Sequence, residues 1–211
     1  MELVQAETLG EAWLEVARRI LERGADAVWD GAPTRELAVL TLTVARPNPG
    51  DAVIAELGDP DWLRWMHENF FVQKDVPELG GAASYAVRLF NYDGAGRDQL
   101  AWVVERLRAN PECRDAAITT FQPNTDTTYI PCVSLLDFWL RDGVVELIVY
   151  AHSLDFGKKA YGNLVELAAL QAHVAAELGV PAGGLVLHVK TAHVYEPELE
   201  LMASLASLPG V

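Results

Sequence analysis

The chain has 211 residues, of which 51% are hydrophobic and 22% charged, so it can bury a core and is not a disordered tail. Its net charge of -14 disfavours nucleic-acid binding through a broad basic face. No apolar run approaches the roughly 20 residues of a membrane span, and the N-terminus lacks the features of a signal peptide. We therefore expect a cytoplasmic protein with one domain over residues 1–211 and no membrane contact.

The first half of the chain predicts several helices and one strand. Hydrophobic residues at helical spacing predict a helix over residues 9–23. Residues 37–45 alternate and are rich in β-branched side chains, which predicts a strand. Short helices are expected over residues 51–57 and 60–71, and residues 72–84 are typical of a loop.

The second half predicts a sheet packed on a long helix. An amphipathic pattern predicts a helix over residues 97–109, and the near-continuous apolar character of residues 160–178 indicates a buried helix. Asp142-Gly143 between two alternating runs predicts a hairpin. Strands are expected over residues 116–121, 132–140, 144–152 and 184–195. The fold class is therefore α/β (α+β), with a mixed, mostly antiparallel sheet on a central helix.

The two cysteines, Cys113 and Cys132, are too few for a disulfide framework or a zinc site, so we expect free thiols and no metal. Each is either a small buried hydrophobe or a nucleophile. Cys132 follows a polar loop at the start of a strand, where reactive side chains meet solvent. A lone cysteine in such a place is more often structural, and its surroundings must decide.

Polar residues follow Cys132 at three further places. His152, Ser153 and Asp155 end the second hairpin strand, and His193 and Tyr195 share one face of the last strand. Asn163 stands in the first turn of the buried helix. Its amide either bonds to the backbone or reads the edge of a heterocycle.

Together these residues resemble a known family. Pro131-Cys132, the segment HSLD at 152–155, Asn163 and the segment AHVY at 192–195 occur in the order and at the intervals of thymidylate synthase and its nucleotide hydroxymethylase relatives. VIAEL at 53–57 more weakly resembles the helix that carries the catalytic glutamate of that family. The resemblance implies a thymidylate-synthase-like sheet and a homodimer that pairs exposed sheet faces.

The resemblance also implies a chemistry. Cys132 would add to C6 of a pyrimidine, so that C5 accepts a one-carbon unit from 5,10-methylenetetrahydrofolate. Glu56 would move protons, and Asn163 would face N3 and the C4 group. The remaining residues would bind the sugar, the folate and ordered waters, namely His193, Tyr195 and Asp155.

Several positions depart from the family. The phosphate would be held by Arg114 and Ser153 alone, because Asp115 and His152 replace arginines, so ordinary dUMP should bind poorly. Val133 replaces the histidine after the cysteine. The sequence ends about sixteen residues after Tyr195, without the tail that closes the family's folate site, so water is expected to reach the one-carbon adduct.

We therefore expect hydroxymethylation at C5 of a pyrimidine nucleoside or nucleotide, in specialised metabolism. The alternatives are a C5 methylase, a binding or partner protein that lost turnover on the same scaffold, and a cysteine enzyme of unrelated chemistry. The retained site residues favour an enzyme, and the lost arginines favour the binding protein.

Overall fold

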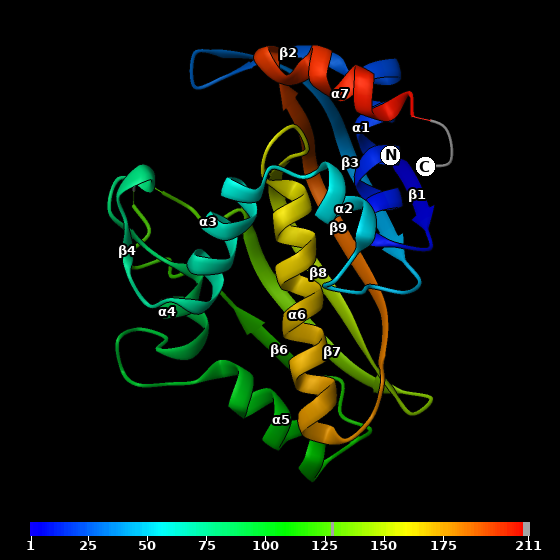
Figure 1. Ribbon diagram of the computed structural model, residues 1–211. Helices are drawn as coiled ribbons and strands as arrows, with labels where there is room; N and C mark the ends of the chain where they lie inside the picture. Colours follow the sequence, from blue (N-terminus) through cyan, green and yellow to red (C-terminus); the bar gives the residue numbers. More distant parts are fainter. Residues whose placement is uncertain (128, 209–211) are drawn as a thin grey trace.

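A twisted sheet runs through the centre of the computed structural model, which describes residues 1–127 and 129–208 (Figure 1). Within these residues the sheet has seven strands in the order β1-β3-β9-β8-β7-β6, with β2 paired to β3. The strands are β1 (Glu2–Ala6), β2 (Ala25–Trp29), β3 (Ala32–Val44), β6 (Ala116–Thr119), β7 (Val133–Arg141), β8 (Val144–Asp155) and β9 (Ala182–Tyr195). The β1–β3 and β8–β9 pairs are parallel and the other pairs antiparallel, which confirms the mixed, mostly antiparallel sheet.

Helices cover one face of this sheet, and α6 crosses in front of β7, β8 and β9 (Figure 1). The helices are α1 (Leu9–Arg23), α2 (Ala52–Leu57), α3 (Pro60–Phe71), α4 (Tyr85–Phe90), α5 (Gln99–Ala109), α6 (Ala160–Leu178) and α7 (Leu199–Ala206). The predicted helices over 9–23, 60–71 and 160–178 match α1, α3 and α6 at both ends.

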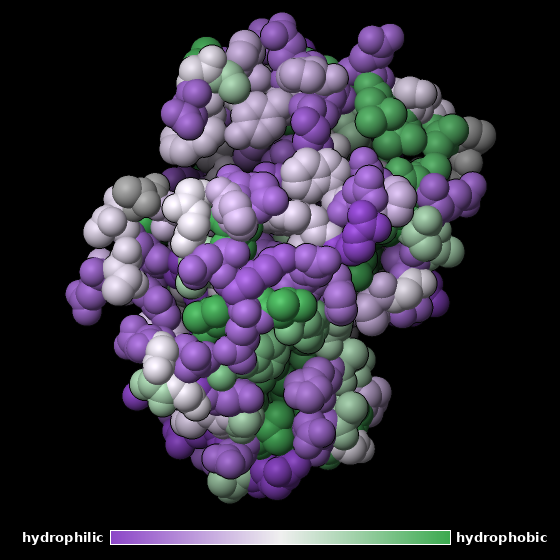
Figure 2. Space-filling model, turned by 60° about the vertical axis from the view of Figure 1, so that its left-hand side comes forward, coloured by the Kyte–Doolittle hydropathy of each residue, from purple (hydrophilic) through white to green (hydrophobic). Residues whose placement is uncertain are grey.

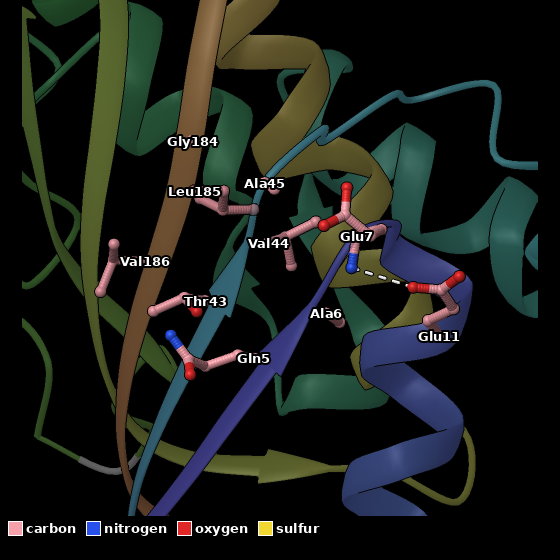
Figure 3. A pocket seen from close by; sticks show the side chains of 10 residues that line it. All are labelled: Gln5, Ala6, Glu7, Glu11, Thr43, Val44, Ala45, Gly184, Leu185 and Val186. Atoms are coloured by element: carbon pink, nitrogen blue, oxygen red, sulfur yellow. Dashed lines mark hydrogen bonds between the residues drawn. The ribbon is translucent and has the colours of Figure 1, made fainter.

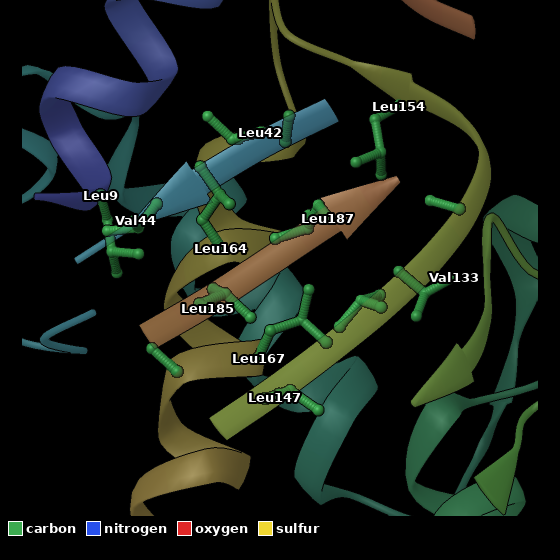
Figure 4. Packing of buried hydrophobic residues seen from close by; sticks show 14 of the residues in the cluster. Leu9, Leu42, Val44, Val133, Leu147, Leu154, Leu164, Leu167, Leu185 and Leu187 are labelled. Atoms are coloured by element: carbon green, nitrogen blue, oxygen red, sulfur yellow. The ribbon is translucent and has the colours of Figure 1, made fainter. Parts of the chain in front are cut away.

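Leucines from α6 and the sheet make the core between these layers. Leu164 and Leu167 project from α6 towards Leu147, Leu185 and Leu187 of β8 and β9 (Figure 4). All five are fully buried. Burying each leucine stabilises the fold by about 1.5–3 kcal/mol, so this contact fixes α6 against the strands.

Local signals in the sequence account for the ends of two elements. Thr8 and Glu11 form a capping box at the start of α1, in which each side chain accepts a hydrogen bond from the other residue's backbone N–H. Asp142 and Gly143 have φ values of 52° and 79°, the left-handed pair that a two-residue hairpin turn requires, and they join β7 to β8.

The structure adds elements that the sequence pattern did not predict. The expected loop over 72–84 contains a small two-stranded sheet, β4 (Asp75–Val76) and β5 (Ala82–Ala83), around the 3-10 turn η1 (Pro77–Leu79). β1, β2, α4, α7 and the 3-10 turn η2 (Glu196–Glu198) were also not expected. All are short. β1 forms by pairing with the distant β3, which periodicity within a short window does not reveal. β2 forms a hairpin with β3 through the turn Asp30-Gly31, a local signal that was overlooked.

The surface on the side of α3 and α4 is mostly hydrophilic, as the acidic composition requires (Figure 2). Hydrophobic side chains gather at the upper right of Figure 2 and again in its lower centre. Leu201 of α7 is 56% exposed. Among the described helices, none has the length and apolar character needed to cross a membrane.

Candidate functional site

A cavity of about 710 Å³ opens where the ends of β8 and β9 meet α3, α4 and α6. The parallel β8–β9 register sets Asp155 beside His193, and β7 begins directly after Cys132. Seven residues predicted for the site line this cavity: Cys132, His152, Ser153, Asp155, Asn163, His193 and Tyr195. The structure thus gathers residues that are up to 63 positions apart in the sequence.

Backbone hydrogen bonds on both sides hold Cys132 in place. The Val133 N–H donates to the hydroxyl of Tyr85 over 2.9 Å, and the His152 N–H donates to the Cys132 carbonyl over 3.0 Å. The Tyr85 ring in turn stacks on Phe70 of α3, with ring centroids 4.4 Å apart. The backbone at Cys132 is therefore held to α4 and β8, and through the stacked Tyr85 and Phe70 rings to α3.

Cys132 is partly exposed at the cavity, and protein surrounds most of its thiol. Burial raises the pKa of its thiol, the positive charge of Lys159 lowers it, and the negative charge of Asp155 raises it again. A hydrogen bond with Tyr129 also lowers it. Burial likewise raises the pKa of Tyr129 far above its ordinary value, so the phenol stays protonated. Formation of a thiolate here depends on the polar groups around the sulfur.

A buried ion pair anchors the loop that leads to Cys132. The Arg88 guanidinium of α4 donates to both carboxylate oxygens of Asp126 over 2.8 Å and to the Thr120 carbonyl over 2.9 Å. Its Nε donates to the Ala83 carbonyl over 3.0 Å. The guanidinium is almost fully buried, so these contacts fix the loop against α4.

Asn163 presents a buried amide to the cavity. Its side chain lies in the first turn of α6, and its Nδ2 donates to the Met66 sulfur over 3.5 Å. A thioether is a weak acceptor, and the structure gives this amide no other side-chain hydrogen bond within the described residues. The amide of Asn163 therefore does not bond to the backbone, which was one of the two alternatives, and it is available to a bound molecule.

Ser153, His193 and Tyr195 form a polar group on β8 and β9. The Ser153 hydroxyl and His193 Nδ1 are 3.3 Å apart, and the His193 and Tyr195 rings meet edge to face at 5.0 Å. Burial lowers the pKa of His193, although the charge of Asp155 opposes the shift. His193 is therefore a neutral hydrogen-bonding group near pH 7.

Asp155 turns the chain from β8 towards α6. Its Oδ1 accepts hydrogen bonds from the N–H groups of Gly157 and Lys158 over 3.0 and 3.2 Å. Burial raises the pKa of its carboxyl, with His193 and these hydrogen bonds opposing the shift. Asp155 is thus a carboxyl group inside the cavity with a raised pKa, which suits a residue that exchanges protons.

Two adjacent lysines serve different cavities. The Lys159 ammonium lies 5.2 Å from the Trp62 ring centroid and 5.5 Å from that of Trp65, on the wall of the main cavity. The Lys158 ammonium pairs instead with the buried carboxylate of Glu198 and lines a second cleft of about 490 Å³.

Two predicted site residues lie outside the cavity. Glu56 is exposed on α2, because the helical repeat turns Ile54 towards the core and places Glu56, two residues later, about 200° away. Arg114 is exposed between α5 and β6. Asp115, which we expected to repel a phosphate inside the pocket, is exposed as well and pairs with Arg106 over 3.1 Å. In a single copy of the chain these three residues lie outside the cavity, and their predicted roles stay predictions.

Several lining residues were not predicted. They come from loops, from α3 and from the outer part of β9, and include Asp30, Trp65, Asn69, Tyr129, Ile130 and Lys190. One pattern in the sequence could have indicated some of them. The predicted helix over 60–71 carries Trp62, Trp65 and several polar residues, a combination that is typical of a binding surface. In the part of the chain that the structure describes, no arginine lines the cavity, and its lysines are Lys159 and Lys190.

The other cavities offer less chemistry. A cavity of about 420 Å³ lies at the edge of β1 and β3 beside the start of α1 (Figure 3). Its Glu11 carboxylate already accepts a hydrogen bond from the Glu7 N–H over 2.9 Å. Across residues 1–127 and 129–208, no group of acidic, histidine and cysteine side chains is arranged to hold a metal ion.

Comparison with known proteins gives one family. The family model described as thymidylate synthase matches residues 49–207. The "Putative thymidylate synthase" of Methanothermobacter marburgensis is 29% identical over 210 residues, covering 92% of this chain and 92% of that protein. That of Methanosarcina barkeri is 27% identical over 207 residues, covering 96% and 94%. The "Bifunctional dihydrofolate reductase-thymidylate synthase" of Leishmania amazonensis is 33% identical over 188 residues, which cover 86% of this chain and 32% of that protein.

Proposed function

The chain belongs to the thymidylate synthase family, and we propose that it transfers a one-carbon unit from 5,10-methylenetetrahydrofolate to C5 of a pyrimidine nucleoside or nucleotide. One observation carries the proposal: a single cavity holds the buried Cys132 thiol together with the open amide of Asn163 and the polar group of Ser153, His193 and Tyr195. A decayed scaffold would have no need to keep a nucleophile, a ring-reading amide and sugar ligands together.

The cavity supports addition of Cys132 to the pyrimidine ring. The thiol gives its proton to water, and the thiolate forms an Sγ–C6 bond while the electron pair of the C5–C6 double bond moves towards the C4 oxygen. C5 thereby becomes nucleophilic. Asn163 faces N3 and the C4 group, donating with its NH2 and accepting with its carbonyl. Asp155, in place of Glu56, is the carboxyl group that exchanges protons near the ring.

The sugar and any phosphate would lie towards β8 and β9. Ser153, His193 and Tyr195 supply hydrogen bonds for the sugar hydroxyl. With no arginine on the described lining, Lys190 and His152 are the side chains of β8 and β9 that could hold a phosphate. One lysine and one mostly neutral histidine hold a dianion weakly, so a monophosphate should bind less tightly than in a site with several arginines.

The remaining wall fits a second flat ring. Trp65, Leu79 and Ile130 give the cavity an aromatic and apolar side, and its volume of about 710 Å³ exceeds the need of a nucleoside alone. A folate held there supplies a one-carbon unit at the oxidation level of formaldehyde. The chain's own contribution is to hold the ring system against Trp65 and to keep Cys132 and C5 facing it.

The product follows from access of water. Ser153, Asp155 and Tyr195 are all partly exposed, and the Cys132 side chain also keeps partial exposure. Once the one-carbon unit had left the folate and C5 had lost its proton, water that enters along these residues would add to the C5 methylene in place of hydride. Departure of the Cys132 thiolate from C6 would then restore the C5–C6 double bond and leave a 5-hydroxymethyl product. The methylase alternative is favoured by the names of the relatives. An absorbance rise from dihydrofolate during turnover would contradict hydroxymethylation.

We further propose a homodimer through the face of the sheet that lies opposite the described helices (Figure 1). Leu135 and Trp139 of β7 and Tyr150 of β8 are 42%, 37% and 41% exposed there. Buried residues of α1, the sheet and α7 belong to one hydrophobic cluster, which supports a single domain over residues 1–211.

Mass spectrometry of covalent adducts tests the function. The protein is incubated with 5-fluorouracil, 5-fluoro-2′-deoxyuridine or its monophosphate, each with and without 5,10-methylenetetrahydrofolate. We expect an adduct on the Cys132 peptide that needs the folate, and none in Cys132→Ala. Cys113→Ala is the matched control and should keep the adduct. Absence of any adduct across the series, with folded protein, would contradict the proposal.

A further inference from the structure

The cavity poses an electrostatic problem for its own nucleophile. Burial raises the pKa of the Cys132 thiol, yet ring addition needs the thiolate. The cations expected from the sequence do not solve it. Arg114 lies outside the cavity, and burial, followed by the charge of Lys190, lowers the pKa of His152, so that this histidine is mostly neutral near pH 7. Burial also lowers the pKa of His193.

We propose that Lys159 activates Cys132: its ammonium, held against the Trp62 and Trp65 rings on the wall of the same cavity, stabilises the thiolate. This inference deepens the proposed function and rests on it. It gives a role to a residue of the turn before α6. Because Lys158 and Lys159 are adjacent and alike, the sequence does not tell which of them faces the cavity.

The backbone places Lys159 firmly. Its N–H donates to the Asp155 carbonyl over 3.0 Å, and its own carbonyl accepts from the Asn163 N–H over 3.0 Å. These bonds tie it to two other residues of the cavity, one on each side. The two tryptophan rings, which meet at 75° with centroids 5.6 Å apart, then fix the ammonium end by cation–π contact. The charge is therefore aimed at the cavity rather than left mobile in solvent.

Lys158 shows what the same side chain does one position earlier. Its ammonium pairs with the Glu198 carboxylate beside η2 and lines the cleft on the other side of the turn. The two lysines are neighbours in the sequence and have the same side chain, but they line separate cavities. Lys158 is therefore a matched control for Lys159.

The other ionisable groups around the thiol come from every element that packs on it. Tyr129 on its own loop and Tyr85 of α4 are protonated phenols, since burial raises the pKa of both. Asp155 carries the opposing negative charge. The titratable groups that share the cavity with Cys132 are Asp30, Tyr85, Tyr129, His152, Asp155, Lys159, Lys190, His193 and Tyr195. Among these, Lys159 is the residue whose positive charge lowers the pKa of the thiol.

Alkylation of Cys132 tests the proposal without any substrate. The rate of reaction with iodoacetamide is followed on the Cys132 peptide by mass spectrometry between pH 6 and 10. The proteins compared are the unaltered chain and the variants Lys159→Met, Lys159→Arg and Lys158→Met. We expect Lys159→Met to lower the rate at pH 7 about tenfold, the effect of losing one close opposite charge. Its rate at high pH, where the thiolate forms without help, should match that of the unaltered chain.

The two remaining variants separate charge from structure. Lys159→Arg keeps a cation on the aromatic pair and should stay within about twofold of the unaltered rate at pH 7. Lys158→Met should leave the whole profile unchanged. If Lys159→Met follows the unaltered profile, or if both methionine variants change it alike, the proposal is overturned. Because alkylation uses neither pyrimidine nor folate, this result is independent of the adduct experiment, which tests the proposed function.

Discussion

Arg88 and Asp126 join α4 to the loop before Cys132 through a buried, two-pronged ion pair. Both side chains are 5% exposed or less, so water cannot solvate one charge when the other is removed. The position of the nucleophile is thus determined by an interaction about six residues away along the chain.

We predict that Asp126→Ala lowers the free energy of unfolding by about 3–5 kcal/mol, because it leaves the Arg88 guanidinium buried without its partner. Urea unfolding followed by circular dichroism measures this. The exposed pair Arg64–Asp61 is the control, and Asp61→Ala should cost less than about 1 kcal/mol. Equal effects of the two substitutions would contradict the role of burial.

Lys190 and His152 should together determine how a phosphate is held. We predict that Lys190→Gln weakens binding of a pyrimidine nucleoside monophosphate about three- to tenfold, since the lysine is exposed and its charge is partly screened. The nucleoside without phosphate is the control ligand and should bind the variant as before. Isothermal titration calorimetry gives both affinities, and an equal loss for the two ligands would count against a phosphate contact.

The pH dependence of the same binding has a defined sign. Burial and the charge of Lys190 lower the pKa of His152, so the ring gains its proton only below the ordinary histidine range. Affinity for the monophosphate should therefore rise as the pH falls through that lower range, and His152→Gln should remove the rise. A pH profile that is identical in the variant would show that another group is responsible.

Glu166 should destabilise the fold at neutral pH. Burial raises the pKa of this carboxyl, which lies on α6 and contacts His67 Nδ1 at 3.3 Å, although the charge of His67 opposes the shift. The folded state therefore holds the proton more tightly than the unfolded chain, and stability falls as the pH rises from the ordinary glutamate value through the raised one. We predict that Glu166→Gln raises the urea midpoint at pH 7. The control is Glu68→Gln, which should not raise it, because the hydrogen bond and charge of Lys74 lower the pKa of Glu68.

The proposed dimer can be broken at one side chain. Trp139→Glu places a charge among Leu135, Trp139 and Tyr150 on the open face of the sheet, and we expect it to shift the protein to monomers in sedimentation velocity. Trp102→Glu is the matched control, because Trp102 is 41% exposed on α5, away from that face. Dissociation by both substitutions, or by neither, would contradict this interface.

The long elements were predictable because their signals are local. The apolar run of α6 and the Asp142-Gly143 turn of the β7–β8 hairpin each depend on residues within one window. The parallel pairing of β8 with β9 was not expected, since it is made after a crossover through α6 and leaves no mark in either strand.

The residues of the site likewise divide into those that local patterns predict and those that depend on tertiary packing. Motif residues on strand ends and on α6, such as Ser153, Asn163 and His193, were found because regular elements fix their direction. Glu56 lies outside the cavity because tertiary packing turns Ile54 of the short helix α2 inwards, and a sequence pattern does not reveal that rotation. Tyr129 was missed because the direction of a loop side chain depends on partners that are distant in the sequence.

The spacing of Asp155, Lys159 and Asn163 has a consequence for natural variation. Each is four residues from the next. Two successive backbone hydrogen bonds connect them, from the Lys159 N–H to the Asp155 carbonyl and from the Asn163 N–H to the Lys159 carbonyl. One inserted residue would rotate everything after it by about 100°, carrying the amide of Asn163 out of reach of the ring that it reads. The segment from Asp155 to Asn163 therefore cannot change in length without moving this amide. Related proteins that keep this site should therefore conserve the length of this segment more strictly than its composition.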